Sequence, residues 1–191
     1  MSNASWLISP QKSLIGEGAT LHFIRRPWAS MLTLRIIFSE DIYSETSSNN
    51  GISYLASRMM LEGTEQWSSQ ELNIYMEKYA IEALALPGGL QFACLKDSWP
   101  KLQKVLAEIL KRPKLEQGRF SKVKRQIEQE LKSSFDDSDQ LAHFHLRQAV
   151  FDKSPGNLLP TGSPQSISSI GESQIRDYWA RNLHADAIRM Y

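Results

Sequence analysis

This sequence of 191 residues has one cysteine, almost no net charge and no long apolar run. Its one cysteine, Cys94, cannot form a disulfide within the chain, so the fold must rest on packing. The 22 basic and 21 acidic side chains leave a formal net charge of +1, which argues against bulk attraction to nucleic acid or to an anionic membrane. No apolar run approaches the roughly 20 residues that a membrane helix needs, so we expect no transmembrane segment.

What the sequence does contain is typical of a soluble globular domain, with 41% hydrophobic and 23% charged residues. The length supports one domain with a sizeable core. Residues 1–4 are interpreted as a start methionine followed by a cloning scar, and no signal peptide follows them. We therefore expect a single domain over residues 5–191, with a last strand that has only begun where the sequence ends.

The apolar patterning predicts strands, then two helices, a hairpin, and further helices. Residues 31–38 are rich in β-branched and aromatic side chains, as a buried strand is, and Pro87-Gly88-Gly89 separates two apolar runs like the turn of a β-hairpin. Other strands are expected over 6–9, 19–24 and 187–191, and the hairpin strands over 81–86 and 90–95. Helices are expected from 52 to a stop at 63, and over 68–79, 99–110, 120–131, 141–151 and 172–182, with loops over 39–50 and 155–164. This order predicts an α+β fold, in which several helices cover a single, mainly antiparallel sheet of about five to six strands.

Gly51, Met59, Gly63 and Thr64 have a distinctive spacing. The segment from Gly51 to Thr64 resembles the active-site helix of the insulinase, pitrilysin and mitochondrial-processing-peptidase superfamily of zinc peptidases. Those enzymes carry an inverted H-x-x-E-H motif inside the frame G-x-x-H-x-x-E-H-M-x-x-x-G-T. The frame is present here, but the residues that perform the chemistry are replaced.

The replaced positions lie on one face of the predicted helix, at the spacing i, i+3 and i+4 that can direct two imidazoles and a carboxylate to one metal ion. The resemblance puts Tyr54 and Arg58 at the two zinc-binding histidines, and Ser57 at the general-base glutamate. A phenol is protonated near neutral pH, arginine is a cation without a free lone pair, and serine cannot perform the proton transfers of a glutamate. We therefore expect no catalytic residue and no metal ligand at Tyr54, Ser57 or Arg58.

A second helix carries the rest of the resemblance. Residues 120–131 are similar to the family's downstream helix, and on that comparison Val123 stands at the third ligand position while Glu130 matches a second, retained glutamate. Val123 also belongs to an apolar stripe with Phe120, Ile127 and Leu131, so we interpret it as a core residue. The similarity extends from about Gly18 to the end of the chain.

The resemblance implies a part of a larger protein. Family members are clamshells of two homologous halves, of which one binds zinc and the other has typically lost the motif and forms a wall of the substrate chamber. This chain resembles the inactive half. We expect it to be no enzyme on its own, to bind no cofactor, and to support a zinc-containing catalytic half, fused or separate, that cleaves peptide substrate.

Two other functions stay open: a non-proteolytic scaffold or assembly subunit, like the core proteins of respiratory complexes that resemble this family, and an independent peptide-binding module. The compartment is not fixed by the sequence, although a bacterial periplasm or cytoplasm fits a soluble domain of this type. Residues 111–132 hold eight basic against three acidic side chains, and Phe120 is the one aromatic residue among them. This indicates a solvated helix face or a wall that faces acidic peptide, and no nucleic-acid partner is expected. His143 and His145 are two apart on a predicted helix, so they face different sides and share no metal.

Overall fold

A computed structural model describes residues 10–15, 18–151 and 155–191. Residues 1–4, interpreted above as a cloning scar, and the strand expected over 6–9 lie outside these residues. The described chain forms one six-stranded sheet in the order β1-β2-β6-β3-β5-β4. The strands are β1 (Gln11–Ile15), β2 (Ala19–Phe23), β3 (Met31–Phe38), β4 (Glu82–Leu86), β5 (Gly89–Leu95) and β6 (Ile188–Met190).

Four of the five neighbouring strand pairs are antiparallel, and the β2–β6 pair is parallel. The longest ladder joins β3 to β5, from Met31 opposite Leu95 to Ile37 opposite Gly89. The predicted α+β fold with a mainly antiparallel sheet is therefore confirmed, and the turn at Pro87 and Gly88 joins β4 to β5 as predicted.

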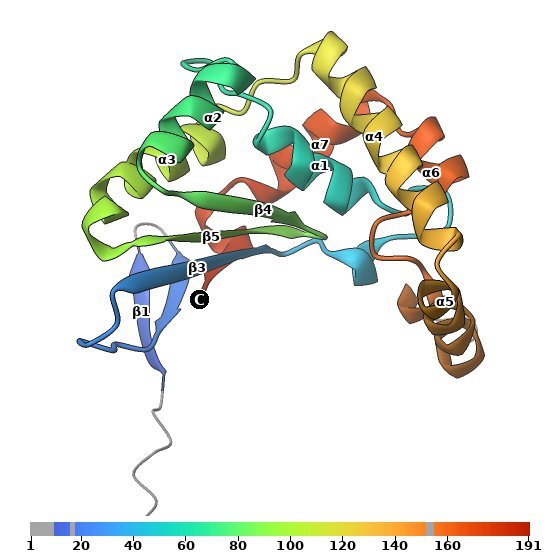
Figure 1. The fold of residues 1–191 in the computed structure, drawn as a ribbon, viewed down its shortest axis with the longest axis horizontal. Helices are drawn as coiled ribbons and strands as arrows, with labels where there is room; N and C mark the ends of the chain where they lie inside the picture. The colour runs from blue at the N-terminus through green and yellow to red at the C-terminus, as the bar shows by residue number, and fades with distance from the viewer. Residues whose placement is uncertain (1–9, 16–17, 152–154) are drawn as a thin grey trace, which may run out of the picture.

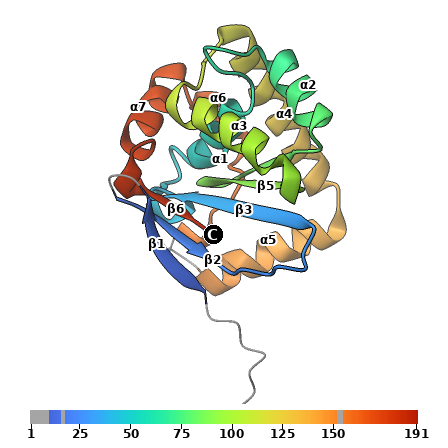
Figure 2. The same cartoon turned by 90° about the vertical axis from the view of Figure 1, so that its left-hand side faces the viewer.

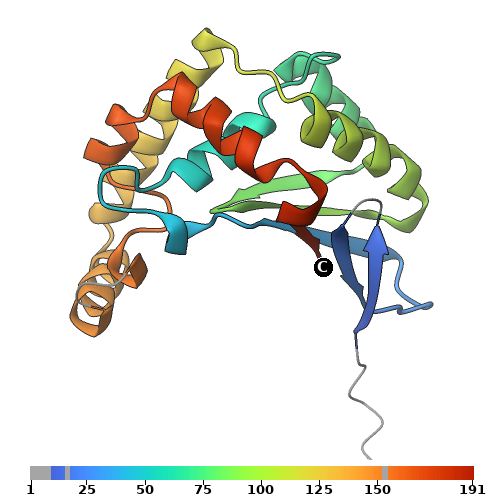
Figure 3. The same cartoon turned by 180° about the vertical axis from the view of Figure 1, so that it is seen from behind.

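Helices cover one face of this sheet (Figures 1 and 3). The helices are α1 (Ile52–Met60), α2 (Ser69–Lys78), α3 (Trp99–Lys111), α4 (Gln117–Phe135), α5 (Ser138–Phe151), α6 (Pro164–Ser169) and α7 (Glu172–Asn182). Helix α5 is the exception to this arrangement, because it lies to one side of the sheet, where it contacts α4. Helix α1 lies centrally, where it contacts β4, β5, α4 and α7. The site residues on α1 are thus held between the sheet and two other helices.

The core follows from alternation along the strands. On β3 the side chains of Leu34, Ile36 and Phe38 are buried toward the helices, while Thr33 and Arg35 are exposed on the open face of the sheet. Helix α1 adds Leu55 and Met59, both fully buried. One contiguous apolar core therefore fixes the position of α1.

Three features differ from the expectations. Strand β1 was not predicted, because all five of its residues are exposed and give no burial pattern. Helix α6 was not predicted either, since it is six residues long and mostly polar. Strand β6 spans Ile188–Met190 where 187–191 was expected, and it pairs on both of its sides, with β2 and β3, so it lies inside the sheet.

Candidate functional site

The site begins at the N-terminus of α1, which a buried glutamate caps. Glu45 is only 4% exposed, and its carboxylate accepts hydrogen bonds from the backbone N–H of Gly51 (2.7 Å) and Ser53 (3.0 Å). The Ser53 hydroxyl (2.6 Å) and the Asn50 amide (3.0 Å) donate to the same carboxylate. A negative charge here satisfies the free N–H groups of the helix and complements its dipole. The sequence analysis missed Glu45, because it lies in the polar stretch that was predicted to be an exposed loop.

Two glycines of the motif frame occupy positions where a side chain does not fit. Gly51 has φ +87°, and a Cβ there would come within 2.7 Å of the Gly162 Cα atom. Gly63, with φ +133°, lies next to a tight turn in which the Thr64 hydroxyl accepts a hydrogen bond from the Trp67 N–H at 3.0 Å. The frame residues therefore have structural tasks that do not require a metal.

Arg58, which projects from α1, is the centre of the site. Its Nη1 donates to the Tyr54 hydroxyl at 3.0 Å and to both carboxylate oxygens of Glu130, each at 3.1 Å. Its guanidinium carbon lies 5.7 Å from the centre of the Tyr54 ring, within cation–π range. The ion pair links α1 to α4 across 72 residues of sequence. The structure thus brings together three of the sequence-predicted residues, Tyr54, Arg58 and Glu130.

The charge of Arg58 is fixed by these contacts. Burial by itself lowers the pKa of an arginine, but the hydrogen bonds and charges of Tyr54 and Glu130 together raise the pKa of Arg58 above its ordinary value. The side chain of Arg58 is 23% exposed and that of Glu130 is 52% exposed. The site therefore presents a permanent cation at the edge of the α1–α4 contact, partly neutralised by one carboxylate.

Ser57 and Val123 are turned into the protein interior. Ser57 is fully buried, and its hydroxyl donates to the Ser53 carbonyl one turn earlier at 2.8 Å. Val123 is fully buried on α4 as part of the predicted apolar stripe. Neither side chain can reach a ligand at the surface. Across the described residues, no group of three or more His, Cys, Asp or Glu side chains is placed to hold a metal ion.

Helix α7 holds α1 and the end of β3 in place. The Trp179 indole N–H donates to the Ala56 carbonyl of α1 at 3.2 Å, and the Asn182 side-chain oxygen accepts from the Glu40 N–H at 2.9 Å. Burial and the nearby Glu40 charge raise the pKa of Tyr178, so its hydroxyl stays protonated and donates to the Glu40 carbonyl. These contacts span more than 120 residues and carry no local sequence signal.

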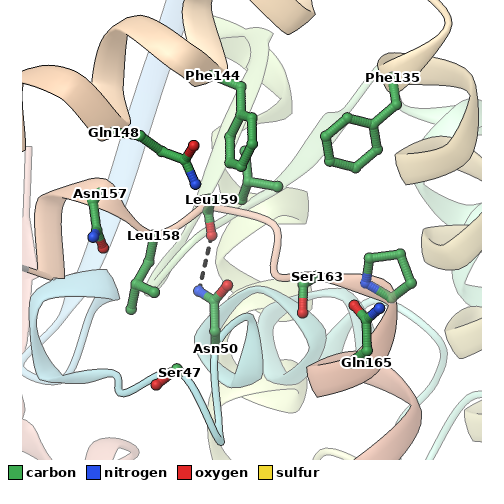
Figure 4. Close-up of a pocket in the computed structure, with 11 residues that line it drawn as sticks. Ser47, Asn50, Phe135, Phe144, Gln148, Asn157, Leu158, Leu159, Ser163 and Gln165 are labelled. Carbon is green, nitrogen blue, oxygen red and sulfur yellow. Dashed lines mark hydrogen bonds between the residues drawn. The ribbon is translucent and has the colours of Figure 1, made fainter. Parts of the chain in front are cut away.

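A separate pocket of about 450 Å³ lies beside the N-terminal end of α1 (Figure 4). Phe135 and Phe144 meet edge to face on one side of it, with ring centres 5.6 Å apart. Asn50 lies below them and donates to the Leu159 carbonyl at 2.9 Å. Among the described residues, every side chain that lines the pocket is uncharged, so these residues suit apolar or neutral polar groups.

Comparison with known proteins identifies relatives over most of the chain. The family model described as insulinase (peptidase family M16) matches residues 42–159. The beta subunit of the mitochondrial-processing peptidase of Saccharomyces cerevisiae is 21% identical over 187 residues, which cover 96% of this chain and 40% of that protein.

Two solved structures have the same fold. A peptidase M16 inactive domain from Pseudomonas fluorescens matches with a TM-score of 0.81 and 19% identity, over 95% of this chain and 45% of that one. A chain of complex III2 from Candida albicans matches with a TM-score of 0.70 and 17% identity, over 94% of this chain and 42% of that one. The chain therefore spans less than half the length of these relatives. In the part of the chain that the structure describes, no helix has both the length and the apolar character needed to cross a membrane.

Proposed function

The chain belongs to the insulinase family of peptidases, family M16, and from this premise we propose that it is a non-catalytic domain of a zinc peptidase. In this role it forms part of the chamber that holds peptide substrate and supports a homologous, catalytic half. The observation that carries the proposal is the guanidinium of Arg58, bonded to Tyr54 and Glu130 at the position where the sequence motif of the family has a metal ligand.

The residues at the four motif positions do not fit a zinc ion. Zinc in proteins takes deprotonated thiolate, neutral imidazole or carboxylate ligands, and Tyr54, Arg58 and Val123 supply none of these. A fixed positive charge repels a divalent cation, and the exposed carboxylate of Glu130 already binds that charge. Ser57, buried and bonded to the Ser53 carbonyl, cannot act as a base toward a surface ligand. We infer that any zinc and any general base belong to the partner half.

Arg58 can replace part of what a metal would do for the fold. A zinc ion bound to ligands on α1 and α4 would connect the two helices, and the Arg58–Glu130 pair connects the same two elements. A second ion pair, Arg119 to Glu62 at 3.7 Å, joins the start of α4 to the segment after α1. The domain thus keeps the α1–α4 contact without a cofactor.

The uncharged pocket near Asn50 supports a role in peptide contact. Its two phenylalanines and surrounding amide and hydroxyl groups can accept an apolar side chain together with the polar backbone of an unfolded peptide. A chamber wall needs such surfaces, because it binds many sequences weakly and releases them.

Reconstitution tests the proposed role. The homologous half with an intact H-x-x-E-H motif, taken from the same genome, is assayed on an unfolded fluorogenic peptide alone and with this chain added. We expect saturable binding and an increase in kcat/KM. The catalytic half with its motif glutamate changed to glutamine is the control, and it must stay inactive with and without this chain. Full activity of the catalytic half alone, with no binding to this chain, would refute the chamber-wall role.

A scaffold or assembly subunit is the second candidate, and the likeness to a chain of complex III2 favours it. A scaffold would bind its partner subunits without changing any peptidase activity. Co-purification of the chain with a multisubunit assembly, together with a negative reconstitution assay, would support this alternative over the chamber wall.

A further inference from the structure

Helices α2 and α3 lie side by side over the part of the sheet formed by β4 and β5 (Figures 1 and 2). Three aromatic side chains form a row here: Trp67 just before α2, Tyr75 on α2 and Tyr79 at its end. The ring centre of Tyr75 lies 4.9 Å from that of Trp67 and 4.8 Å from that of Tyr79. All three side chains are half-buried and pack against the hydrophobic core, so the fold fixes their positions.

Three lysines reach over these rings. The ammonium group of Lys104, on α3, lies 5.2 Å from the centre of the first ring and 5.8 Å from that of the second. At the third ring, Tyr79, the ammonium groups of Lys101 from α3 and Lys78 from α2 lie 5.2 Å and 5.4 Å from the centre. These distances are within cation–π range. We call the three rings and these three lysines the aromatic–lysine row.

The ring contacts order the lysines without neutralising them. A ring attracts an ammonium group through its quadrupole and takes up neither the charge nor the N–H donors, which stay available to an anion. All three lysines are exposed, and among the described residues no carboxylate lies within 4.0 Å of their ammonium groups. Because the rings already restrict these long side chains, an anion that binds them loses less rotamer entropy than it would at a free lysine.

Two glutamates lie one turn from the row, and they leave it positive. Glu71 precedes Tyr75 by four residues on α2, and its carboxylate accepts hydrogen bonds from the Ser68 N–H (2.9 Å) and hydroxyl (2.8 Å). Glu108 follows Lys104 by four residues on α3 without pairing to it within 4.0 Å. The first carboxylate is thus engaged at the start of α2, and three lysines face two glutamates in all.

The contacts favour an acidic polypeptide over a nucleic acid. Bases of single strands stack on open ring faces, whereas each ring of the row already contacts another ring and at least one lysine. An apolar contact lies beside the charges, because Ile74 is 56% exposed and one turn before Lys78 on α2. A peptide segment that carries both carboxylates and apolar side chains matches this combination.

We propose that the aromatic–lysine row is a docking site for an acidic segment of a partner polypeptide. One carboxylate binds Lys78 and Lys101, which converge from two helices on one ring, and a second carboxylate binds Lys104. A neighbouring apolar side chain of the segment packs on Ile74. The inference rests on the contacts of α2 and α3, so its failure would leave the proposed non-catalytic function untouched.

The test is binding of acetyl-Asp-Leu-Asp-Phe-Asp-amide to the 191-residue chain, measured by titration calorimetry and by the NMR signal of the Trp67 indole N–H. We expect saturable binding that shifts this signal, and that weakens about tenfold when NaCl is raised from about 20 mM to about 0.3 M. The same peptide with asparagine at each aspartate should not bind detectably. Glycine in place of its leucine and phenylalanine should weaken binding by about threefold or more.

Protein variants locate the site. Lys101→Gln combined with Lys104→Gln removes two charges of the row and should weaken binding by about tenfold or more. The matched control is Lys122→Gln combined with Arg125→Gln, which removes the same charge from two exposed residues three apart on α4, away from the row. The control should change the affinity by less than about twofold. All four residues are exposed, so both double variants should fold, which circular dichroism checks.

Two results would overturn the docking site itself: an equal loss of affinity in both double variants, which would indicate attraction by net charge alone, and an unmoved Trp67 indole signal at saturating peptide. Tighter binding of a short oligothymidylate, or of phosphatidylglycerol vesicles, through the same lysines would overturn the assignment to a polypeptide. A dimer in analytical ultracentrifugation that Lys101→Gln with Lys104→Gln abolishes would overturn it as well, because a second copy would then occupy the row.

Discussion

The ion pair between Arg58 and Glu130 should contribute measurably to the stability of the domain. The perturbation is a double-mutant cycle with Arg58→Ala, Glu130→Ala and the double variant, which isolates the coupling energy of the pair. At 3.1 Å and an effective dielectric constant of about 20, the gross Coulomb attraction is about 5 kcal/mol. Desolvation of Arg58 and the 52% exposure of the Glu130 side chain offset most of it, so the expected coupling is about 1 kcal/mol.

Urea unfolding followed by circular dichroism measures this coupling from the free energies of unfolding of the four proteins. Because the pair is half exposed, 1 M NaCl should reduce the coupling by about half. The Arg119–Glu62 pair, at 3.7 Å, serves as the matched control and should show a coupling below about 0.5 kcal/mol. A coupling near zero at low salt would refute the view that Arg58 connects α1 to α4. A value above about 3 kcal/mol would instead indicate a fully desolvated pair.

Three further predictions concern the surroundings of the site. Leu55→Ala should lower the free energy of unfolding by about 2–5 kcal/mol in the same urea assay, because Leu55 is fully buried. Glu45→Ala should cost about 2–4 kcal/mol, and Glu45→Gln less, since glutamine keeps one acceptor for the N-terminal groups of α1. The hydrogen bond from Arg181 lowers the pKa of Glu40 below its ordinary 4.5. The stability that this carboxylate adds, measured as the difference in unfolding free energy between wild type and Glu40→Gln, should therefore be complete at pH 7. It should be lost below pH 4.5, as the pH falls through the lowered pKa of the folded state.

Much of the fold could be predicted because its elements have strong local signals. The apolar run of β3 and the Gly-rich turn of the hairpin each depend on neighbouring residues, and the structure contains both. Strand β1 and helix α6 are the opposite case. They bury little or no apolar surface, so periodicity could not reveal them.

The candidate site was only partly predictable from sequence. Helical spacing placed Tyr54 and Arg58 on one face, and the apolar stripe of α4 placed Val123 in the core, as the structure has them. The bond from Arg58 to Glu130 spans 72 residues, so it depends on how α1 packs against α4. Glu45 was missed for a related reason: a glutamate in a polar stretch looks solvated, and only the folded loop turns its carboxylate back onto α1.

Zinc stoichiometry tests the central claim most directly. The chain and a variant with Y54H, R58H and V123E, which restores three ligands, are equilibrated with excess zinc, desalted and measured by inductively coupled plasma mass spectrometry. The account predicts less than about 0.1 zinc per wild-type chain and about one per variant chain, because only the variant offers imidazole and carboxylate ligands. About one zinc per wild-type chain, lost in the Arg58→Ala or Glu130→Gln variant, would contradict the account.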